Sequence, residues 1–155
     1  EIDLMKDLHL LTFKPILYVY NISGDEPKTD FGLKIDIKTE EDLMEMSDED
    51  KKELGMQSNL DKLIIEAYKL LGIITFLTTG EDETRAWIIK KGSTAPEAGA
   101  AIHTDFKEKF IKADVINWQK LLDVGSYAQA REKGFVRIEG KDYIVQDGDV
   151  IDFKI

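Results

Sequence analysis

Six cationic side chains between residues 85 and 112 are the residues of this chain whose type and spacing are best suited to chemistry. They are Arg85, Lys90, Lys91, Lys107, Lys109 and Lys112. Guanidinium and ammonium groups contact phosphate oxygens, and an indole such as that of Trp87 can stack on a base. These cations predict a patch that faces RNA or a ribosome. The alternative is that each is a solvated charge balanced by a nearby acid such as Glu97 or Glu108, with Trp87 in a hydrophobic core.

No arrangement for covalent or metal-dependent catalysis accompanies these cations. The chain has no Cys, and its two His, His9 and His103, are too far apart in sequence to indicate a zinc site. His103 precedes a Thr-Asp pair, but without a Ser or Cys nucleophile motif a structural role at a helix end is favoured. A Gly-x-x-x-x-Gly-Lys-[Ser/Thr] loop for phosphate is absent, because the one Gly-Lys pair, Gly140-Lys141, is followed by Asp. The sequence therefore predicts no catalytic residue and no metal ligand.

The net charge of -10 at pH 7 is concentrated in the first half of the chain. Residues 1–72 hold 9 Lys/Arg and 17 Asp/Glu, whereas residues 73–155 hold 12 and 14. Much of the excess lies in Thr39–Glu53, which would repel a phosphate backbone and is typical of a solvated helical face. Only the second half is therefore predicted to face RNA. No apolar run approaches the roughly 20 residues that cross a bilayer, so we expect no membrane partner and a cytoplasmic location.

Hydrophobic spacing and capping residues predict the elements of the first half. These elements are a helix containing Leu4, Leu8 and Leu11, a buried strand at Ile16–Tyr20, a second strand at Leu33–Ile37, and acidic helical turns capped by Thr39 with Asp42 and by Ser47 with Asp50. A longer amphipathic helix then begins at Ser58 and ends at Gly72, a typical C′ glycine. We place a domain boundary after Gly72.

The second half reads as a strand pair, a capped helix, and further short strands and helices. The predicted elements are strands at Ile73–Thr78 and Arg85–Lys90, a helix opened by Thr94, Pro96 and Glu97, a strand at Ile111–Ile116, helices at Trp118–Val124 and Ser126–Lys133, and strands at Phe135–Ile138, Tyr143–Val145 and Val150–Ile155. This order indicates an α+β fold with helices on one face of a sheet. A single core is expected from Ile73, Phe76, Trp87, Ile89, Ile102, Phe106, Ile111, Val115, Leu121, Phe135, Ile144, Val150 and Phe153.

Two motifs of the second half are also similar to a family signature. Thr84–Phe106 reads Thr-Arg-Ala-Trp-Ile-Ile-Lys-Lys-Gly-Ser-Thr-Ala-Pro-Glu-Ala-Gly-Ala-Ala-Ile-His-Thr-Asp-Phe, and Gly140–Asp149 reads Gly-Lys-Asp-Tyr-Ile-Val-Gln-Asp-Gly-Asp. In this order they resemble the C-terminal part of the YchF GTPases, the Obg-related family that includes the Obg-like ATPases. The resemblance implies that residues 73–155 form a TGS domain with a β-grasp, ubiquitin-like fold. It also implies that residues 1–72 are the C-terminal remnant of a Ras-like P-loop α/β nucleotide-binding (G) domain with a linking helix.

Members of that family are Mg²⁺-dependent ATPases or GTPases that associate with the ribosome, and their TGS domain is a regulatory or RNA- and protein-binding element. The chain begins at Glu1 without a Met, so we interpret it as a piece of a larger NTPase. We expect no enzyme activity and no cofactor for this chain itself, with Mg-ATP or Mg-GTP bound by the intact parent. The expected partner is the ribosome or a structured RNA. The alternative is a ubiquitin-like protein–protein interaction module without a nucleic-acid role.

The resemblance also assigns a nucleotide-base contact to Asn21 and Ile22. In the family, a strand ending in Asn-x-x-Glu reads the base, and the strand before Asn21 fits this pattern. Gly24 occupies the position of the Glu, so the choice between ATP and GTP is open, and Asn21 is equally typical of a turn. The interval from Pro27 to Leu33 is shorter than the family's helical crossover between parallel strands. We therefore expect either a deleted helix or missing residues there.

Overall fold

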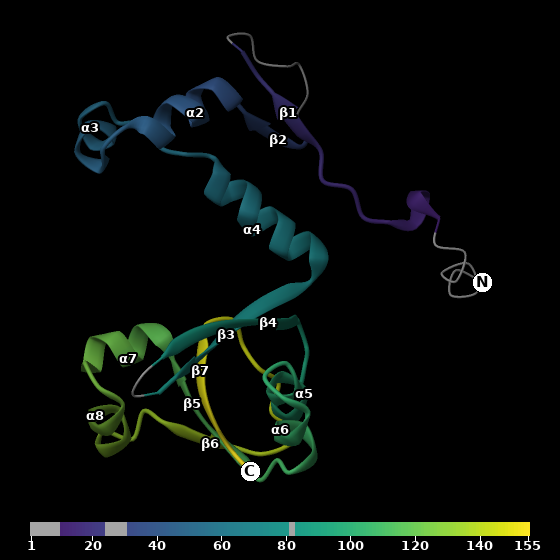
Figure 1. Ribbon diagram of the computed structural model, residues 1–155, viewed down its shortest axis with the longest axis vertical. Helices are drawn as coiled ribbons and strands as arrows, with labels where there is room; N and C mark the ends of the chain where they lie inside the picture. Colours follow the sequence, from purple (N-terminus) through teal and green to yellow (C-terminus); the bar gives the residue numbers. More distant parts are fainter. Residues whose placement is uncertain (1–9, 24–30, 81–82) are drawn as a thin grey trace. The chain divides into compact units, whose positions relative to one another are not determined.

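The computed structural model describes residues 10–23, 31–80 and 83–155 of the chain. The chain divides into two compact units, Glu1–Leu71 and Gly72–Ile155 (Figure 1). Each unit has its own secondary structure and is described separately below. The predicted helix containing Leu4 and Leu8 falls outside the described residues, which begin here with a short 3-10 helix at Leu11–Phe13.

The described residues of the first unit form one small parallel sheet and three α-helices, besides the 3-10 helix. Its elements are β1 (Val19–Asn21), β2 (Leu33–Ile35), α2 (Ile37–Glu45), α3 (Asp48–Glu53) and α4 (Leu60–Leu71). β1 and β2 pair in parallel, with Val19 opposite Leu33 and Asn21 opposite Ile35. The two strands are joined by residues 22–32, so a parallel pair forms despite the short connection. Because the strands run in parallel, their carboxyl ends meet at one edge, where α2 begins.

Two predictions for this unit are wrong. The strand expected to be buried at Ile16–Tyr20 spans only Val19–Asn21, and the side chains of Ile16 and Val19 are 59% and 45% exposed. Its sheet has two strands, so within the described residues no further strand shields it. The helix expected to be capped by Thr39 begins three residues earlier, because the Asp36 carboxylate accepts hydrogen bonds from the N–H groups of Lys38 and Thr39 and is the N-cap.

Polar contacts organise the helices that follow. Ser47 caps α3 as predicted, with its Oγ accepting from the Asp50 N–H at 3.1 Å. Glu40, which is 6% exposed, accepts from Ser58 Oγ at 2.6 Å and from the Asn59 N–H at 2.7 Å. These bonds tie α2 to the start of α4. Gly72 follows α4 with φ of +62°, the left-handed conformation expected of a C′ glycine.

The second unit is a five-stranded mixed sheet with two helices on each side. Its elements are β3 (Ile73–Thr79), β4 (Thr84–Lys90), α5 (Ala95–Ala100), α6 (Thr104–Glu108), β5 (Lys112–Asn117), α7 (Trp118–Val124), α8 (Tyr127–Glu132), β6 (Arg137–Glu139) and β7 (Asp149–Lys154). The strand order is β4-β3-β7-β5-β6, in which β3 and β7 are parallel and the other pairs are antiparallel.

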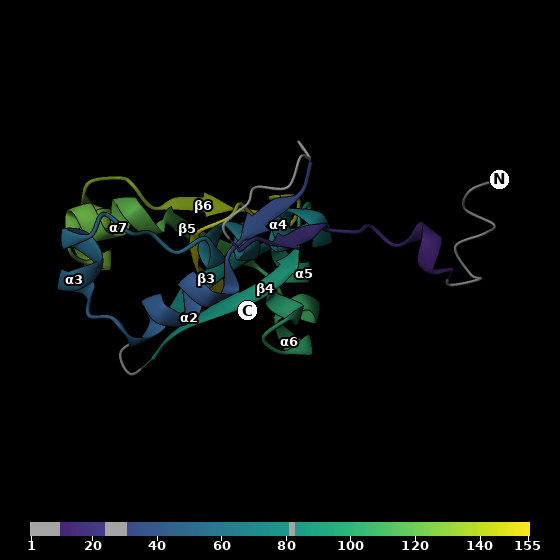
Figure 2. The same cartoon turned by 90° about the horizontal axis from the view of Figure 1, so that it is seen from above.

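Alternate residues of each strand build two cores, one on each face of this sheet. Phe76, Val115 and Ile151 belong to the larger cluster with Ala95 and Ala98 of α5. Residues next to them in the strands form a smaller cluster with helices α7 and α8. That cluster contains Ile116, Ala130 and Val150, with Leu77, Leu121, Val124, Tyr127 and Val136 packed against it. Figures 1 and 2 show α5 and α6 on one side of the sheet and α7 and α8 on the other.

The prediction of one core with helices on one face is therefore wrong. Side chains alternate across a strand, so adjacent apolar residues such as Val115 and Ile116 must face opposite layers. Three residues expected in the core, Ile111, Phe135 and Ile144, are 66%, 41% and 43% exposed. All three lie outside the strands of the sheet.

Local signals in this unit were otherwise informative. Glu97 Oε2 accepts from the Thr94 N–H at 2.8 Å and from Thr94 Oγ1 at 3.0 Å, which caps α5 as predicted. These bonds lower the pKa of Glu97. Ser126 Oγ accepts from the Gln129 N–H at 3.3 Å and caps α8. The strand expected at Tyr143–Val145 is reduced to one bridge, between Ile144 and Thr94.

Candidate functional site

Asn21 and Ile22, the predicted base contacts, lie at the carboxyl end of β1. The Asn21 Oδ1 accepts a 3.3 Å hydrogen bond from the Ile37 N–H at the first turn of α2. Ile22 donates its N–H to the Ile35 carbonyl at 2.9 Å, which extends the parallel pairing by one residue. The two residues are thus held at the edge where ligands of parallel α/β sheets bind. Gly24, which the resemblance places at the position of the Glu in Asn-x-x-Glu, lies outside the described residues.

The six predicted cations do not lie on one face of the second unit. Arg85 and Lys90 are five residues apart on β4, so their side chains point to opposite faces of the sheet. Arg85 shares its face with Trp87, and its guanidinium carbon lies 4.4 Å from the centre of the indole ring. Lys91 follows β4, where its N–H donates to the Gly72 carbonyl at 2.8 Å.

The other three cations lie on different elements. Lys107 lies on α6, and Lys109 is the C-cap of that helix. Lys109 Nζ forms a 2.9 Å ion pair with Asp105. Lys112 begins β5 opposite Lys154 of β7. It alternates with Ala113 of the larger core, so it lies on the face of the sheet opposite α6. The register therefore separates Lys112 from Lys107 and Lys109.

His103 has the structural role that its position predicts. It is the N-cap of α6, where its Nδ1 accepts from the Asp105 N–H at 3.2 Å. Within residues 10–23, 31–80 and 83–155, no group of three or more His, Cys, Asp or Glu is arranged to hold a metal ion. In the same residues, no helix is both long enough and apolar enough to cross a membrane.

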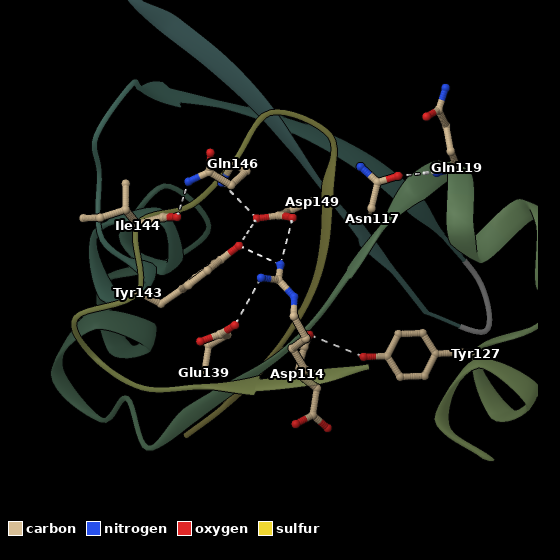
Figure 3. Close-up of polar contacts among 10 residues, drawn as sticks. Asp114, Asn117, Gln119, Tyr127, Glu139, Tyr143, Ile144, Gln146 and Asp149 are labelled. Carbon is tan, nitrogen blue, oxygen red and sulfur yellow. Dashed lines mark hydrogen bonds and ion pairs between the residues drawn. The ribbon is translucent and has the colours of Figure 1, made fainter. Parts of the chain in front are cut away.

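Sequence reasoning missed a polar network around Asp149, which is 2% exposed. Its Oδ2 accepts from the Tyr143 hydroxyl at 2.7 Å and from the Gln146 N–H at 2.9 Å (Figure 3). Arg137 Nη2 donates to the Tyr143 hydroxyl at 2.9 Å, and its Nη1 lies 3.3 Å from Glu139. Burial and the bond to Asp149 raise the pKa of Tyr143 to about 12. The network joins β6 to the start of β7, and its polar groups bond to one another, so we interpret its role as structural.

A second buried acid, Asp114, lies on the sheet beneath α8. Arg131 of α8 pairs with its Oδ2, while its Oδ1 has no hydrogen-bond partner. The Tyr127 hydroxyl donates to the Asp114 carbonyl at 3.3 Å, and burial together with the charge of Asp114 raises the pKa of Tyr127 to about 12. A cavity of about 440 Å³ lies nearby, lined by Thr79, Gly80, Tyr127, Val150, Ile151 and Asp152. Hydroxyl and carboxylate groups there can accept hydrogen bonds, but the lining offers no activated nucleophile.

Comparison with known proteins identifies relatives along both units. Residues 73–155 match the family model YchF-GTPase_C, described as a protein of unknown function (DUF933). The chain is 45% identical to the ribosome-binding ATPase YchF of Bacillus subtilis, over 97% of this chain and 48% of that protein. It is 38% identical to the Obg-like ATPase 1 of Caenorhabditis elegans, over 99% of this chain and 45% of that protein.

A solved structure is similar over nearly the same extent. The Schizosaccharomyces pombe YchF GTPase superposes with a TM-score of 0.84 and 30% sequence identity, covering 99% of this chain and 47% of that chain. This chain thus spans about half the length of the curated relatives it matches. The alignment with the B. subtilis protein has 174 positions, so at least 19 of them have no counterpart among these 155 residues. The chain belongs to the YchF family and carries its C-terminal domain.

Proposed function

We propose that residues 73–155 are a TGS-type interaction module that a YchF NTPase uses to bind the ribosome through structured RNA. The observation that carries this proposal is the match of residues 73–155 to the YchF C-terminal family, together with relatives that are named ribosome-binding ATPases. By this proposal the protein acts in the cytoplasm, where ribosomes are.

The topology of the second unit supports a β-grasp assignment. In that fold a β-hairpin and a later strand pair flank a helix that packs across one sheet face. Here β3 and β4 form the hairpin, β7 pairs in parallel with β3, and α5 packs its buried Ala95 and Ala98 onto the larger core. The same architecture serves RNA-binding and protein-binding domains, so the function must rest on the surface residues.

We further propose that residues 1–72 complete a nucleotide-binding domain whose remaining part is not in this chain. A parallel sheet is normally covered on both faces, yet Val19 of β1 and the preceding Ile16 and Tyr18 are each at least 45% exposed. Helix α4 has an apolar stripe but no buried residue. Asn21 and Ile22, at the carboxyl edge of the sheet, would then border the base of Mg-ATP or Mg-GTP in the intact protein.

The cations divide into groups with different prospects for contacting phosphate. Lys109 is paired with Asp105. The hydrogen bonds with Thr94 are the main cause of the lowered pKa of Glu97, and the charge of Lys107 lowers that pKa further. In the described residues Lys90 and Lys91 have no ion pair with an acid. Phosphate contacts therefore release more free energy at Lys90 and Lys91 than at Lys109, because no existing ion pair must be broken.

Ribosome co-sedimentation of the 155-residue chain across a salt series tests the proposal. We expect binding that weakens steeply with salt. The slope of the logarithm of the binding constant against the logarithm of the salt concentration should be less steep by roughly two units in the variant Lys90→Glu/Lys91→Glu. The variant Lys107→Glu/Lys109→Glu should have a smaller effect. Lys51→Glu/Lys52→Glu on acidic α3 is the matched control, because it makes the same change in net charge. Equal slopes in all three variants would refute RNA contact by these lysines and favour the protein-interaction alternative.

A further inference from the structure

Strand β4 forms an open edge of the five-stranded sheet (Figure 1). Its seven residues pair with β3 without interruption, from Lys90 opposite Ile73 to Thr84 opposite Thr79. The strand contains no proline and no bulge. Long edges without such features are rare in natural proteins, because their free backbone groups can pair with another strand.

The hydrogen bonds at the two ends of the hairpin fix which backbone groups of β4 face outward. The Lys91 N–H donates to the Gly72 carbonyl at 2.8 Å, and the Gly80 N–H donates to the Glu83 carbonyl at 2.9 Å. Hydrogen-bonded and non-hydrogen-bonded pairs alternate in an antiparallel ladder. Arg85, Trp87 and Ile89 therefore bond inward to β3. The N–H and C=O groups of Thr84, Ala86 and Ile88 point away from the sheet.

These outward groups are available to a partner. Among the described residues, no backbone or side-chain group bonds to the N–H or C=O of Thr84, Ala86 or Ile88. The next outward residue, Lys90, already accepts from the Ser93 N–H at 3.1 Å, so the open edge ends there. Thr84, Ala86 and Ile88 thus offer three N–H donors and three C=O acceptors along the edge, which is the pattern that an added strand requires.

The side chains along the edge indicate what the added strand would carry. Ala86 and Ile88 lie on one face at the centre of β4, both exposed, with Ile88 55% exposed. Arg85 near one end, and Lys90 and Lys91 at the other, have no acidic partner among the described residues. Side chains of opposite charge on neighbouring strands stabilise the pairing of the two strands, and so do apolar side chains that face each other. An added strand with acidic ends and an apolar centre would match β4 in both respects.

We propose that β4 is a docking edge for an extended segment of a partner protein, which adds as a sixth strand and has an apolar centre flanked by carboxylates. This inference goes beyond ribosome binding and does not depend on it. An edge of alternating N–H and C=O groups matches a polypeptide backbone, whereas a phosphate chain offers acceptors only. A second copy of this chain is a poorer match, because it brings the same cations and a net charge of -10.

The experiment uses the ¹⁵N-labelled 155-residue chain and two synthetic peptides, acetyl-Glu-Val-Thr-Val-Thr-Val-Glu-amide and its counterpart with Lys at both ends. With the Glu-flanked peptide, amide exchange at Ala86 and Ile88 should slow roughly tenfold, a change of about 1.4 kcal/mol. The amide of Trp87, already bonded to β3, should change little. The Lys-flanked peptide should bind about fivefold more weakly because the end charges repel.

Two variants isolate the edge. Ala86→Pro removes an outward N–H without breaking a bond to β3, so it should abolish peptide binding in a folded protein, whereas Ala86→Ser should bind normally. Arg85→Glu/Lys91→Glu keeps the backbone and reverses the charge at two positions that are six residues apart and share the face of the peptide's end residues. It should reverse the preference between the peptides, which tests the proposal even if Ala86→Pro unfolds.

Several results would overturn the proposal. Equal binding of both peptides, or no binding of either by the folded chain, would do so. Protection of Ala86 that rises with protein concentration alone would identify a second copy as the occupant. Displacement of the peptide by a single-stranded RNA would identify a nucleic-acid site. Ala86→Pro leaves Lys90 and Lys91 in place, so it should lose strand addition and keep ribosome binding. Failure of strand addition and failure of ribosome binding are therefore distinguishable.

Discussion

The Tyr143 hydroxyl donates a 2.7 Å hydrogen bond to the buried carboxylate of Asp149, and this bond connects two residues of the Gly140–Asp149 motif. The same carboxylate accepts the Gln146 N–H, so the loop that leads into β7 is closed on itself. Arg137 approaches Asp149 Oδ1 at 3.6 Å and connects the loop to β6. A charged group this deeply buried is stable only while its partners are in place.

Tyr143→Phe should lower the free energy of unfolding by about 1–3 kcal/mol, because Asp149 and Arg137 each lose a partner. Tyr127→Phe is the matched control in the same unit. Its hydroxyl makes one 3.3 Å bond to a backbone carbonyl, so the loss should be smaller. Urea denaturation measures both. Equal losses would show that the Asp149 network contributes no more than an ordinary hydrogen bond.

The second unit should lose stability at alkaline pH. The folded pKa of Tyr143 and of Tyr127 is about 12, against an ordinary 10.0. Above pH 10 the unfolded chain releases these protons while the folded chain keeps them. The stabilisation is therefore complete below pH 10 and is lost as the pH rises through about 12. Denaturation midpoints from pH 9 to pH 12, with tyrosinate absorbance, measure this loss, which should be smaller in Tyr143→Phe.

Gly148→Ala should be far more destabilising than Gly134→Ala. Both glycines have positive φ, +79° and +71°, so both substitutions carry a backbone strain of roughly 1–2 kcal/mol. A Cβ on Gly148 would also lie 2.5 Å from Trp118 Cδ1, whereas a Cβ on Gly134 meets nothing within 4 Å. Overpacking should add about 1–3 kcal/mol at Gly148. Thermal midpoints give the comparison, and equal shifts would contradict the close approach of Trp118.

Local sequence signals were sufficient for most of the elements of the second unit. Helix α7 has the predicted bounds, Trp118–Val124, and β3 and β4 each differ from prediction by one residue. Apolar periodicity and a cap define such elements from within a short window. No strand forms at the predicted Tyr143–Val145. This segment makes one bridge, between Ile144 and Thr94, with hydrogen bonds from the Ala95 N–H to the Tyr143 carbonyl and from the Val145 N–H to the Ser93 carbonyl.

Properties that depend on distant partners could not be read in the same way. Which face of the sheet receives Val115 or Ile116 depends on helices elsewhere in the chain, and the two-sided sheet was missed for this reason. Lys112 is separated from Lys107 because the pairing of β5 with β7 decides which face of the sheet Lys112 occupies. An Asp inside an apolar strand, as at Asp114, is a signal that could have been found, but its partner Arg131 lies 17 residues away.

The 155-residue chain should show no ATP or GTP hydrolysis above background. Phosphoryl transfer needs a loop that cradles phosphates and a carboxylate that holds Mg²⁺, and the sequence contains no Gly-x-x-x-x-Gly-Lys-[Ser/Thr] motif. Nucleotide binding through Asn21 and Ile22 alone should also fail, since phosphate contacts supply most of the binding energy. Phosphate release measures hydrolysis. Mg²⁺-dependent activity that copurifies with the chain through further purification would contradict this prediction.

Residues 73–155 should fold without the rest of the chain. Of the 16 buried hydrophobic residues among those described, only Ile35 and Leu43 belong to the first unit. We therefore expect the excised residues 73–155 to melt cooperatively, at the temperature of the main transition of the whole chain. Val115→Ala, at a fully buried position, should lower the free energy of unfolding by about 2 kcal/mol, both in the excised fragment and in the whole chain. A fragment that melts at a lower temperature, or without cooperativity, would show that helix α4 stabilises this core.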